Sequence, residues 1–375
     1  MDFSLSDEQE LIRASAAEFC AREVVPHARD WDREEDIDRA LVGKLAEVGY
    51  LGAWELDTIS YALIMEELGK ADSSVRGIVS VNVGLVGKTI AKWGTEAQQR
   101  EWLPPLASGD ALGCYALTEP GSGSDPSSLV TRASREGDAW VLSGSKIFIT
   151  LGSWAGLALV FARTGEEGAR GLTCFLVPTD TDGFSATRIK GKLGLRAQDT
   201  AELTLDGVQV PDANRLGGEG DGFKVAMSAL DNGRISLAAG CVGIAQGCLD
   251  ACLRHAAERY QFGKPIASHQ LVQELIAEIA VETEAARLLT WRAATLADAG
   301  VRHTLESSVA KYYASEASVR AANAAVQVHG GYGYIDEYPV GKYLRDARVT
   351  TLYEGTSQIQ KLIIGRALTG ESAFT

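Results

Sequence analysis

The chain has 375 residues, of which 46% are hydrophobic and 23% charged. These are ordinary proportions for a globular protein, and the length predicts two or three structural regions. The 36 lysines and arginines are outnumbered by 50 aspartates and glutamates, which gives a net charge of −14. A charge of this sign repels phosphate backbones and anionic lipids, so neither nucleic acid nor a membrane is an expected partner.

The six cysteines and five histidines show none of the spacings typical of a metal site, so no metal is expected. The first residues, MDFSLSDEQELIRASAAEF, are acidic and amphipathic. A signal peptide needs a basic start and an apolar core, and a membrane span needs about 18 to 20 apolar residues. We therefore expect a cytoplasmic protein with reduced thiols.

Residues 1–111 are predicted to form an α-helical domain. Ser6 followed by Gln9 resembles a capping box, which marks the start of a helix. Helical periodicity returns over residues 36–48 and 59–68, and Gly49 and Gly69 stand where helices would end. Residues 77–95 are apolar enough to form a buried helix.

Residues 112–218 are predicted to form a β domain, either a sandwich or a barrel. Short β-type runs alternate there with glycine-containing turns, and no alternation of strand and helix suggests a Rossmann domain. The predicted strands are 114–117, 140–142, 146–150, 157–162, 172–177 and 202–210. The helical period then returns over residues 219–375, which are predicted to form a C-terminal helical domain.

Two segments of the predicted β domain have the composition of a ligand-binding wall. YALTEPGSGSD (115–125) runs from a strand into a turn that would expose backbone N–H groups and hydroxyls, which suits a pyrophosphate or the edge of a flavin. KIFIT (146–150) would present Phe148 and Thr150 on one face of a strand. Taken alone, each segment is equally compatible with an ordinary surface loop and an ordinary strand.

Three further segments lie in the C-terminal region. Arg259, in RYQFGKPI, could contact a phosphate or simply complement the end of a helix. QVHGGYGY (327–334) has glycines that permit close approach of a ligand or only a loose connection. Glu354 follows apolar and aromatic residues, so it suits a general base of raised pKa or a glutamate at the start of a helix.

Taken together and in this order, these segments resemble the acyl-CoA dehydrogenase family, of the short-, medium- or branched-chain type with a C-terminal catalytic glutamate. The motifs are YALTEPGSGSD, KIFIT, KLGLRAQDTAEL, RYQFGKPIASHQ, QVHGGYGY and YEGTSQIQ, and the resemblance extends from Leu5 to Gly370. It implies an N-terminal helical domain, a middle β domain and a C-terminal four-helix bundle. It also implies bound FAD, an acyl-CoA substrate, a role in fatty acid β-oxidation, transfer of electrons to an electron-transfer flavoprotein, and a homotetramer.

The resemblance assigns roles to individual residues. Those expected to surround the flavin ring and ribityl chain are Tyr115, Leu117, Thr118, Gly123, Ser124, Phe148, Ile149 and Thr150, with Thr356 and Gln358 closing the site. Those expected to reach FAD across a subunit boundary are Arg259, Gln261, Phe262, Gln270, Gln327 and Gly331. Ser124, Asp231, Arg234 and Gly355 are expected on the substrate side.

Glu354 matches the catalytic base, which would remove the α-proton while a hydride leaves the β-carbon. Its backbone N–H and a ribityl hydroxyl would bind the thioester carbonyl. Some relatives carry the base on an earlier helix, at the position that Gly233 occupies here, and glycine cannot act as a base. Glu354 is therefore the one candidate base that the resemblance leaves.

The chain departs from the family pattern at three places. The connection over residues 49–57 lacks a Pro-Glu-Glu-Tyr-Gly-Gly stretch that usually lies near the acyl pocket. Leu151 replaces a common asparagine, and Phe148 stands where tryptophan is frequent. The shortened connection is expected to alter the shape of the pocket, and the two substitutions to alter contacts with the flavin.

Other activities compete with dehydrogenation of an acyl-CoA. The runner-up is a dehydrogenase of an acyl or aminoacyl group on a carrier protein in a biosynthetic pathway, which would differ mainly at the mouth of the site. An acyl-CoA oxidase would differ in oxygen access. A flavin-binding relative that binds DNA or acts as a monooxygenase is disfavoured by Glu354 and by the negative net charge.

Overall fold

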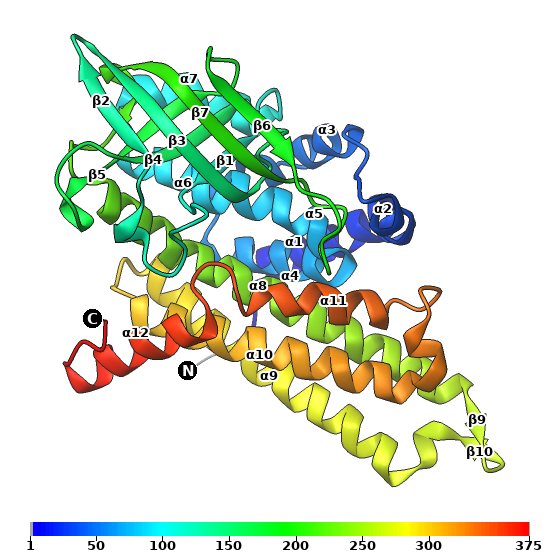
Figure 1. The fold of residues 1–375 in the computed structure, drawn as a ribbon. Helices are drawn as coiled ribbons and strands as arrows, with labels where there is room; N and C mark the ends of the chain where they lie inside the picture. The colour runs from blue at the N-terminus through cyan, green and yellow to red at the C-terminus, as the bar shows by residue number, and fades with distance from the viewer. Residues whose placement is uncertain (1–2, 375) are drawn as a thin grey trace.

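The structure is a computed structural model that describes residues 3–374, and it stacks a β-sheet region, a layer of N-terminal helices and a C-terminal set of long helices (Figure 1). The N-terminal helices are α1 (Asp7–Glu23), α2 (Ala28–Glu34), α3 (Ala40–Glu47), α4 (Thr58–Ala71), α5 (Ser73–Val79), α6 (Lys88–Trp93) and α7 (Glu96–Ser108), with a π-helix (Ser80–Gly87) between α5 and α6.

Side-chain caps begin several of these helices. The predicted capping box of Ser6 and Gln9 starts α1, and Thr95 with Gln98 forms a second one at α7. Gly49 follows α3 in the left-handed conformation (φ 79°), as expected of a glycine after a helix end. The helix expected over 36–48 is shorter, because it begins only at Ala40.

The prediction that Gly69 ends a helix is wrong, because α4 continues to Ala71. Gly69 lies where α4 crosses a C-terminal helix, and a Cβ atom on it would meet the Gly240 carbonyl oxygen at 2.4 Å. Glycine is needed at this position for close packing of two helices rather than for a turn. The buried helix expected over 77–95 is confirmed, except that its middle is a π-helix.

The middle region is an eight-stranded sheet of order β6-β7-β3-β2-β4-β5-β8, with β1 pairing in parallel with β4. Its strands are β1 (Gly113–Ala116), β2 (Arg132–Glu136), β3 (Ala139–Thr150), β4 (Leu157–Arg163), β5 (Leu172–Pro178), β6 (Phe184–Arg188), β7 (Thr200–Pro211) and β8 (Arg215–Leu216). β4 and β5 are buried along almost their whole length, which is why they read as continuous apolar runs in the sequence.

Two sequence expectations for this sheet need correction. The runs 140–142 and 146–150 belong to one strand, β3, which has irregular register at Gly144 and again between Lys146 and Ile149. Phe148 lies in the second irregularity with φ 60°, so the simple alternation expected for KIFIT does not hold. β2 and β6 were not predicted, because their residues are mostly polar and exposed.

The C-terminal region consists of α8 (Gly222–Glu258), α9 (Gln270–Asp298), α10 (Thr304–His329), α11 (Val340–Thr350) and α12 (Ser357–Thr369). α8, α9 and α10 pack along one another, α11 covers α8 and α10, and the short hairpin β9 (Tyr260–Gln261) and β10 (Lys264–Pro265) projects from the far end (Figure 1). The predicted order of helices, β-sheet and four-helix bundle is thus confirmed. α8 is long and apolar enough to cross a membrane, but 78% of its most apolar window is buried inside the protein, as in a core helix.

Candidate active site

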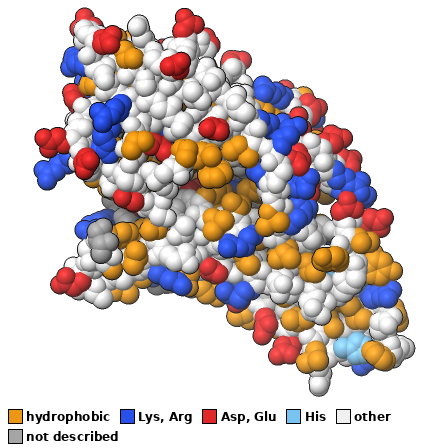
Figure 2. Space-filling view, viewed as in Figure 1, with side chains coloured by type: hydrophobic (Ala, Val, Ile, Leu, Met, Phe, Trp, Pro, Cys, Tyr) orange, Lys and Arg blue, Asp and Glu red, His pale blue; other side chains and the backbone are white. Residues whose placement is uncertain are grey.

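A cavity of about 1510 Å³ lies where the sheet, the N-terminal helices and the C-terminal helices meet. Figure 2 shows hydrophobic side chains gathered around the hollow below the sheet region. The lining comes from the π-helix and α5 on one side, from β1, β3 and their loops on another, and from α8, α12 and the segment before α12 on a third. Typical ligand pockets hold about 300–1,000 Å³, so this cavity can hold a ligand larger than a drug-sized molecule.

One wall of the cavity is formed by the two segments singled out in the sequence. All eight residues expected around the flavin ring line it: Tyr115, Leu117, Thr118, Gly123, Ser124, Phe148, Ile149 and Thr150. Phe148 is 66% exposed on the wall, which is unusual for a phenylalanine. The wall therefore offers exposed aromatic and apolar surface interspersed with hydroxyls and backbone N–H groups.

A buried ion pair holds this wall together from behind. Lys146 Nζ lies 2.8 Å from Glu119 Oε1 and also donates to the carbonyl oxygens of Leu117 and Phe161, at 3.2 and 2.6 Å. Glu119 accepts two further hydrogen bonds, from the backbone N–H groups of Val130 and Thr131. Burial lowers the pKa of Lys146 to about 8, although Glu119 opposes this shift. The pair fixes β3 against the segment that follows β1.

Glu354 reaches the cavity from a strained turn between α11 and α12. Its φ is 54° and that of Gly355 is 89°, so two successive residues adopt the left-handed conformation. Gln360 Nε2 donates to the carbonyl oxygens of Glu354 and Gly355, and Lys311 Nζ donates to that of Gly355 at 2.7 Å. Thr356 caps α12 by accepting from the Ile359 N–H. These contacts hold the turn that orients Glu354.

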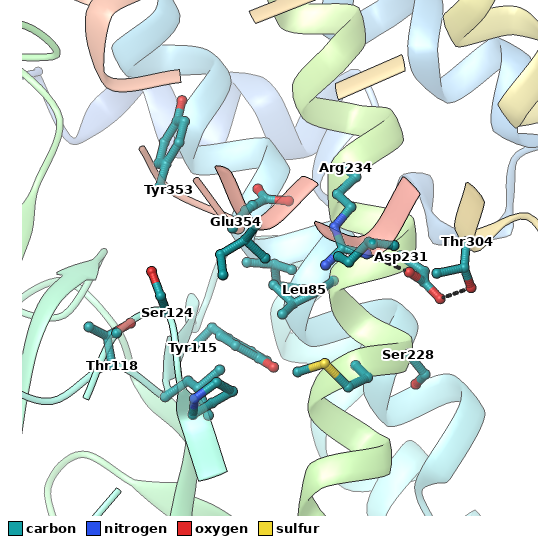
Figure 3. Close-up of a pocket in the computed structure, with 18 of the residues that line it drawn as sticks. Leu85, Tyr115, Thr118, Ser124, Ser228, Asp231, Arg234, Thr304, Tyr353 and Glu354 are labelled. Carbon is teal, nitrogen blue, oxygen red and sulfur yellow. Dashed lines mark hydrogen bonds and ion pairs between the residues drawn. The ribbon is translucent and has the colours of Figure 1, made fainter. Parts of the chain in front are cut away.

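The Glu354 carboxylate has a buried oxygen without a hydrogen-bond partner among the described residues, Oε2, although the residue as a whole is partly open to the cavity. Burial raises its pKa above the ordinary value, while Arg76, Lys311 and Arg234 act in the opposite direction. A carboxylate that is buried, directed into a cavity and not neutralised by a contact ion pair has the properties of a general base. Figure 3 shows it between Tyr115 of β1 and Arg234 of α8.

Gly233 makes room for this carboxylate. A Cβ atom on Gly233 would meet Glu354 Oε2 at 2.4 Å and a methyl carbon of Leu85 at 2.8 Å. Any side chain at position 233 would therefore displace Glu354. Gly233 was expected from the sequence to have no catalytic role, and the structure shows that it has a steric one.

Asp231 and Arg234, which the resemblance places on the substrate side, form a polar network on α8. Arg234 Nη1 lies 2.7 Å from Asp231 Oδ1, and Thr304 Oγ1 donates to Asp231 Oδ2 at 2.8 Å (Figure 3). Both residues line the cavity, and Gly355 lines it as well. Burial lowers the pKa of Arg234 while Asp231 opposes that shift, so Arg234 has a dedicated counter-ion.

The remaining predicted residues do not line this cavity. Thr356 and Gln358 lie at the start of α12, beside the cavity but outside its lining. The six residues expected to act across a subunit boundary lie toward the opposite end of the bundle, on or near the β9–β10 hairpin and the adjoining ends of α8, α9 and α10: Arg259, Gln261, Phe262, Gln270, Gln327 and Gly331. Within one chain, these six residues therefore lie apart from the eight predicted cofactor residues that line the cavity.

Sequence reasoning missed Arg76, Gln198, Lys311 and Tyr353. Arg76 and Lys311 carry charges inside runs that read only as helices, and their burial depends on how α5 and α10 pack against the other elements. Gln198 lies in the quoted KLGLRAQDTAEL segment, and it donates to Thr150 Oγ1 while its Oε1 is buried without a partner among the described residues. For Arg76 and Lys311, the signal in the sequence that could have indicated a buried charge was an isolated arginine or lysine within a helical run.

The residues of the cavity fit an isoalloxazine ring with an acyl thioester beside it. The wall supplies flat apolar contacts through Phe148 and Leu117, and hydroxyls through Thr118 and Thr150. The unpartnered Gln198 Oε1 supplies a hydrogen-bond acceptor near that wall. The volume also exceeds that of a pocket for a single ligand of ordinary size. Within residues 3–374, no group of three or more histidine, cysteine, aspartate or glutamate side chains is arranged to hold a metal ion.

This fold and site define a class of enzyme, the flavoprotein oxidoreductases that act on acyl thioesters. Family models of acyl-CoA dehydrogenase match the chain in three parts: the N-terminal domain over residues 6–110, the middle domain over 114–208 and the C-terminal domain over 220–369. The chain therefore belongs to the acyl-CoA dehydrogenase family. It is an FAD-dependent oxidoreductase, and FAD is the cofactor of this family.

Individual relatives agree with this assignment. The chain is 42% identical to the short-chain specific acyl-CoA dehydrogenase of Mus musculus mitochondria over 96% of this chain and 90% of that protein. Butyryl-CoA dehydrogenase from Megasphaera elsdenii superposes with a TM-score of 0.96 and 38% identity, covering 98% of this chain and all of that one. A chain from the electron transferring flavoprotein structure of Acidaminococcus fermentans has a TM-score of 0.97 and 39% identity, covering 99% and 100%.

Proposed function

We propose that the enzyme removes hydrogen from the α and β carbons of an acyl-CoA thioester to give a 2-enoyl-CoA, with Glu354 as the base. The observation that carries the proposal is the buried, unpartnered Oε2 of Glu354, directed into a cavity with a flavin-compatible wall. FAD supplies the acceptor for the hydride that leaves the β-carbon. The bound thioester would lie between this wall and Glu354.

In this proposal, Glu354 Oε2 takes the α-proton of the substrate. The raised pKa makes the carboxylate a stronger base than an exposed glutamate, and the nearby positive charges of Arg76, Lys311 and Arg234 limit the rise. The Glu354 N–H donates to the thioester carbonyl, where negative charge develops. Gln360 and Lys311 hold the turn in place, so that the backbone N–H and the carboxylate of Glu354 both stay positioned to contact the substrate.

The cofactor residues of the proposal come from two chains. Tyr115, Thr118 and their neighbours hold the ring and ribityl chain, and Thr356 and Gln358 support the site from α12. Arg259, Gln261, Phe262, Gln270, Gln327 and Gly331 of another subunit hold the pyrophosphate and adenosine end, as expected in a homotetramer. Exposed Phe262 (94%), Tyr334 (90%) and Leu271 (75%) at that end of the bundle support such an interface. Electrons would pass from the flavin to an electron-transfer flavoprotein.

Anaerobic reduction of the purified flavoprotein tests the function. Acyl-CoA thioesters of graded length and branching are added, and bleaching of the flavin absorbance is recorded. At least one CoA ester is expected to bleach the flavin and to yield its 2-enoyl product. Reduction only by an acyl group on a carrier protein would instead assign the enzyme to carrier-bound substrates, and no reduction by either class would refute dehydrogenation.

A further inference from the structure

A buried glutamine beside the wall proposed to face the flavin has no role in the mechanism proposed above. Gln198 belongs to the KLGLRAQDTAEL segment, lines the cavity and is only 4% exposed. Its Nε2 donates to Thr150 Oγ1, at the end of β3, over 3.1 Å. Its Oε1 is buried without a hydrogen-bond partner among the described residues. A buried amide that is only partly paired carries a free-energy cost, so its presence at the site calls for an explanation.

The loop that carries Gln198 is held in place on both sides of this residue. The backbone N–H of Gln198 donates to the Leu195 carbonyl oxygen at 3.1 Å, and Lys192 Nζ donates to the carbonyl oxygen of Gln198 at 2.8 Å. The next residue, Asp199, accepts hydrogen bonds from the backbone N–H and the hydroxyl of Ser153, at 2.9 and 2.6 Å. The backbone therefore fixes the position from which the Gln198 side chain reaches Thr150.

Gly77 of α5 leaves the space that the end of the Gln198 side chain occupies. A Cβ atom on Gly77 would meet Gln198 Oε1 at 1.9 Å and Cδ at 2.8 Å. These distances are too short for non-bonded atoms, so any side chain at position 77 would displace the amide. The hydrogen bond between Gln198 and Thr150 therefore depends on a glycine in the facing helix.

The direction of this hydrogen bond decides what the Thr150 hydroxyl can do. A hydroxyl has one hydrogen to donate and lone pairs that accept. Because Thr150 Oγ1 accepts from Gln198 Nε2, this contact does not use the hydroxyl hydrogen, and Thr150 donates it to no described residue. Thr150 lines the cavity and is half-buried. Its hydrogen is therefore available to an acceptor inside the cavity.

We propose that Gln198 is a positioning residue that orients the Thr150 hydroxyl toward the flavin ring and so raises the reduction potential of the bound FAD. The proposal rests on the placement of the flavin against this wall in the function proposed above. Electron density on the nitrogen and oxygen acceptors of a flavin ring grows on reduction. A hydrogen bond donated to such an acceptor therefore stabilises the reduced form more than the oxidised form.

The test measures the midpoint potential of the FAD-loaded enzyme by slow anaerobic reduction against a reference dye, with no thioester present. Gln198→Met nearly keeps the volume of the side chain but removes the donor, and Thr150→Val removes the hydroxyl. Each substitution is expected to lower the ratio of reduced to oxidised flavin at a fixed potential by about 3- to 10-fold, which is about 15–30 mV for a two-electron couple. Gln198→Met/Thr150→Val is expected to match Thr150→Val, because Gln198 acts only through the hydroxyl.

Two further variants separate positioning from a general loss of structure. Gly77→Ala leaves the interacting side chains chemically intact and is expected to lower the potential as Gln198→Met does, because its methyl group displaces the amide. Gln246→Met removes a half-buried glutamine whose amide binds Asp250 and Arg287 in the helical bundle, and it is expected to leave the potential unchanged. FAD content and the midpoint of thermal unfolding are measured for every variant.

A second substitution at the same position keeps the test decisive if Gln198→Met does not retain FAD. Gln198→Glu has almost the same shape, but its carboxylate accepts a hydrogen bond and would draw the Thr150 hydroxyl away from the flavin. Its negative charge lowers the potential in any background. The fall should therefore be larger when Gln198→Glu is introduced into wild type than when it is introduced into Thr150→Val.

The outcomes distinguish this inference from the proposed function. A potential that is unchanged or raised in Gln198→Met, or a double variant in which the two shifts add, would overturn the inference. If acyl thioesters nevertheless reduce the flavin, the proposed function stands without it. If the potential responds to Gln198 and Thr150 as expected but no thioester reduces the flavin, the inference stands and the proposed function is wrong.

Discussion

At the residue scale, the proposed chemistry depends on opposing effects on the pKa of one carboxylate. Burial of Glu354 raises its pKa, and Arg76, Lys311 and Arg234 limit the rise without forming a contact ion pair with it. Gly233 leaves the space that Oε2 occupies. The sequence identified Glu354 and Gly233 through a motif, but it could not identify Arg76 or Lys311, because their positions beside Glu354 come from the packing of α5 and α10.

The raised pKa of Glu354 predicts a pH dependence of both rate and stability. The base must be ionised, so the rate of flavin reduction should rise with pH through a pKa above 4.5 and then level off. Over the same range the folded state binds more protons than the unfolded state, so the contribution of Glu354 to the free energy of unfolding should fall as pH rises. Stopped-flow reduction and denaturant unfolding of wild type and Glu354→Gln measure the two effects. The stability effect should be absent in the variant, and equal pH profiles for the two proteins would contradict this.

At the element scale, the cavity wall proposed to face the flavin depends on a buried ion pair that no sequence pattern revealed. The strands β1, β3, β4, β5 and β7 were predictable from apolar runs, whereas the register irregularity at Phe148 was not. Lys146 begins the KIFIT segment, and its side chain is completely buried, because its Nζ donates to Glu119 and to two carbonyl oxygens. Period-2 patterning identifies which segments are strands but not which polar side chains are buried between them.

Removing Lys146 should therefore damage both folding and flavin binding. Lys146→Met leaves Glu119 as a buried, unpaired carboxylate and should lower the free energy of unfolding by about 3–5 kcal/mol. Denaturant unfolding and FAD content after dialysis measure the two losses. The double variant Lys146→Met/Glu119→Gln is the control and should recover part of the stability, because it removes the buried charge. A single variant as stable as wild type would contradict the structural role of the pair.

The crossing of α4 and α8 predicts a contrast between two helical glycines. Gly69→Ala should destabilise the protein by about 1–3 kcal/mol, because the new methyl group would meet the Gly240 backbone. Gly43, in α3, has no atom within 4 Å of an added Cβ, so Gly43→Ala should be neutral or stabilising by up to about 1 kcal/mol. Thermal unfolding measures both. Equal effects of the two substitutions would show that α4 and α8 do not approach so closely.

At the scale of the whole molecule, the predicted cofactor residues fall into two separated groups. The eight that are expected to surround the flavin ring line one cavity, and the six expected to hold the other end of FAD lie toward the opposite end of the bundle. The sequence predicted the three-region architecture well, because long helical and β-type stretches follow one another. The way in which two chains associate depends on exposed residues such as Phe262. Hydrophobic periodicity in the sequence does not indicate which exposed residues form such a surface.

A single charge at this end of the bundle should therefore affect both assembly and cofactor binding. Phe262 is 94% exposed, and Phe262→Asp should reduce the oligomeric mass and increase the loss of FAD on dilution by about tenfold or more. Leu11→Asp places the same charge on an exposed apolar residue of α1 and serves as the control. Light scattering gives the mass and flavin fluorescence the release of FAD. A Phe262 variant that keeps both its mass and its FAD would contradict a cofactor site shared between subunits.

The most direct test of the central claim is single-turnover reduction of the FAD-loaded Glu354→Gln variant. A CoA ester that bleaches the wild-type flavin is mixed anaerobically with each protein, and the rate constant of bleaching is measured. Because glutamine fills the same space but cannot accept the α-proton, the account predicts that the variant keeps its FAD and its affinity for the thioester while the rate constant falls by about 10²–10⁴-fold. Bleaching of the variant at a rate close to that of wild type would contradict the assignment of Glu354 as the base.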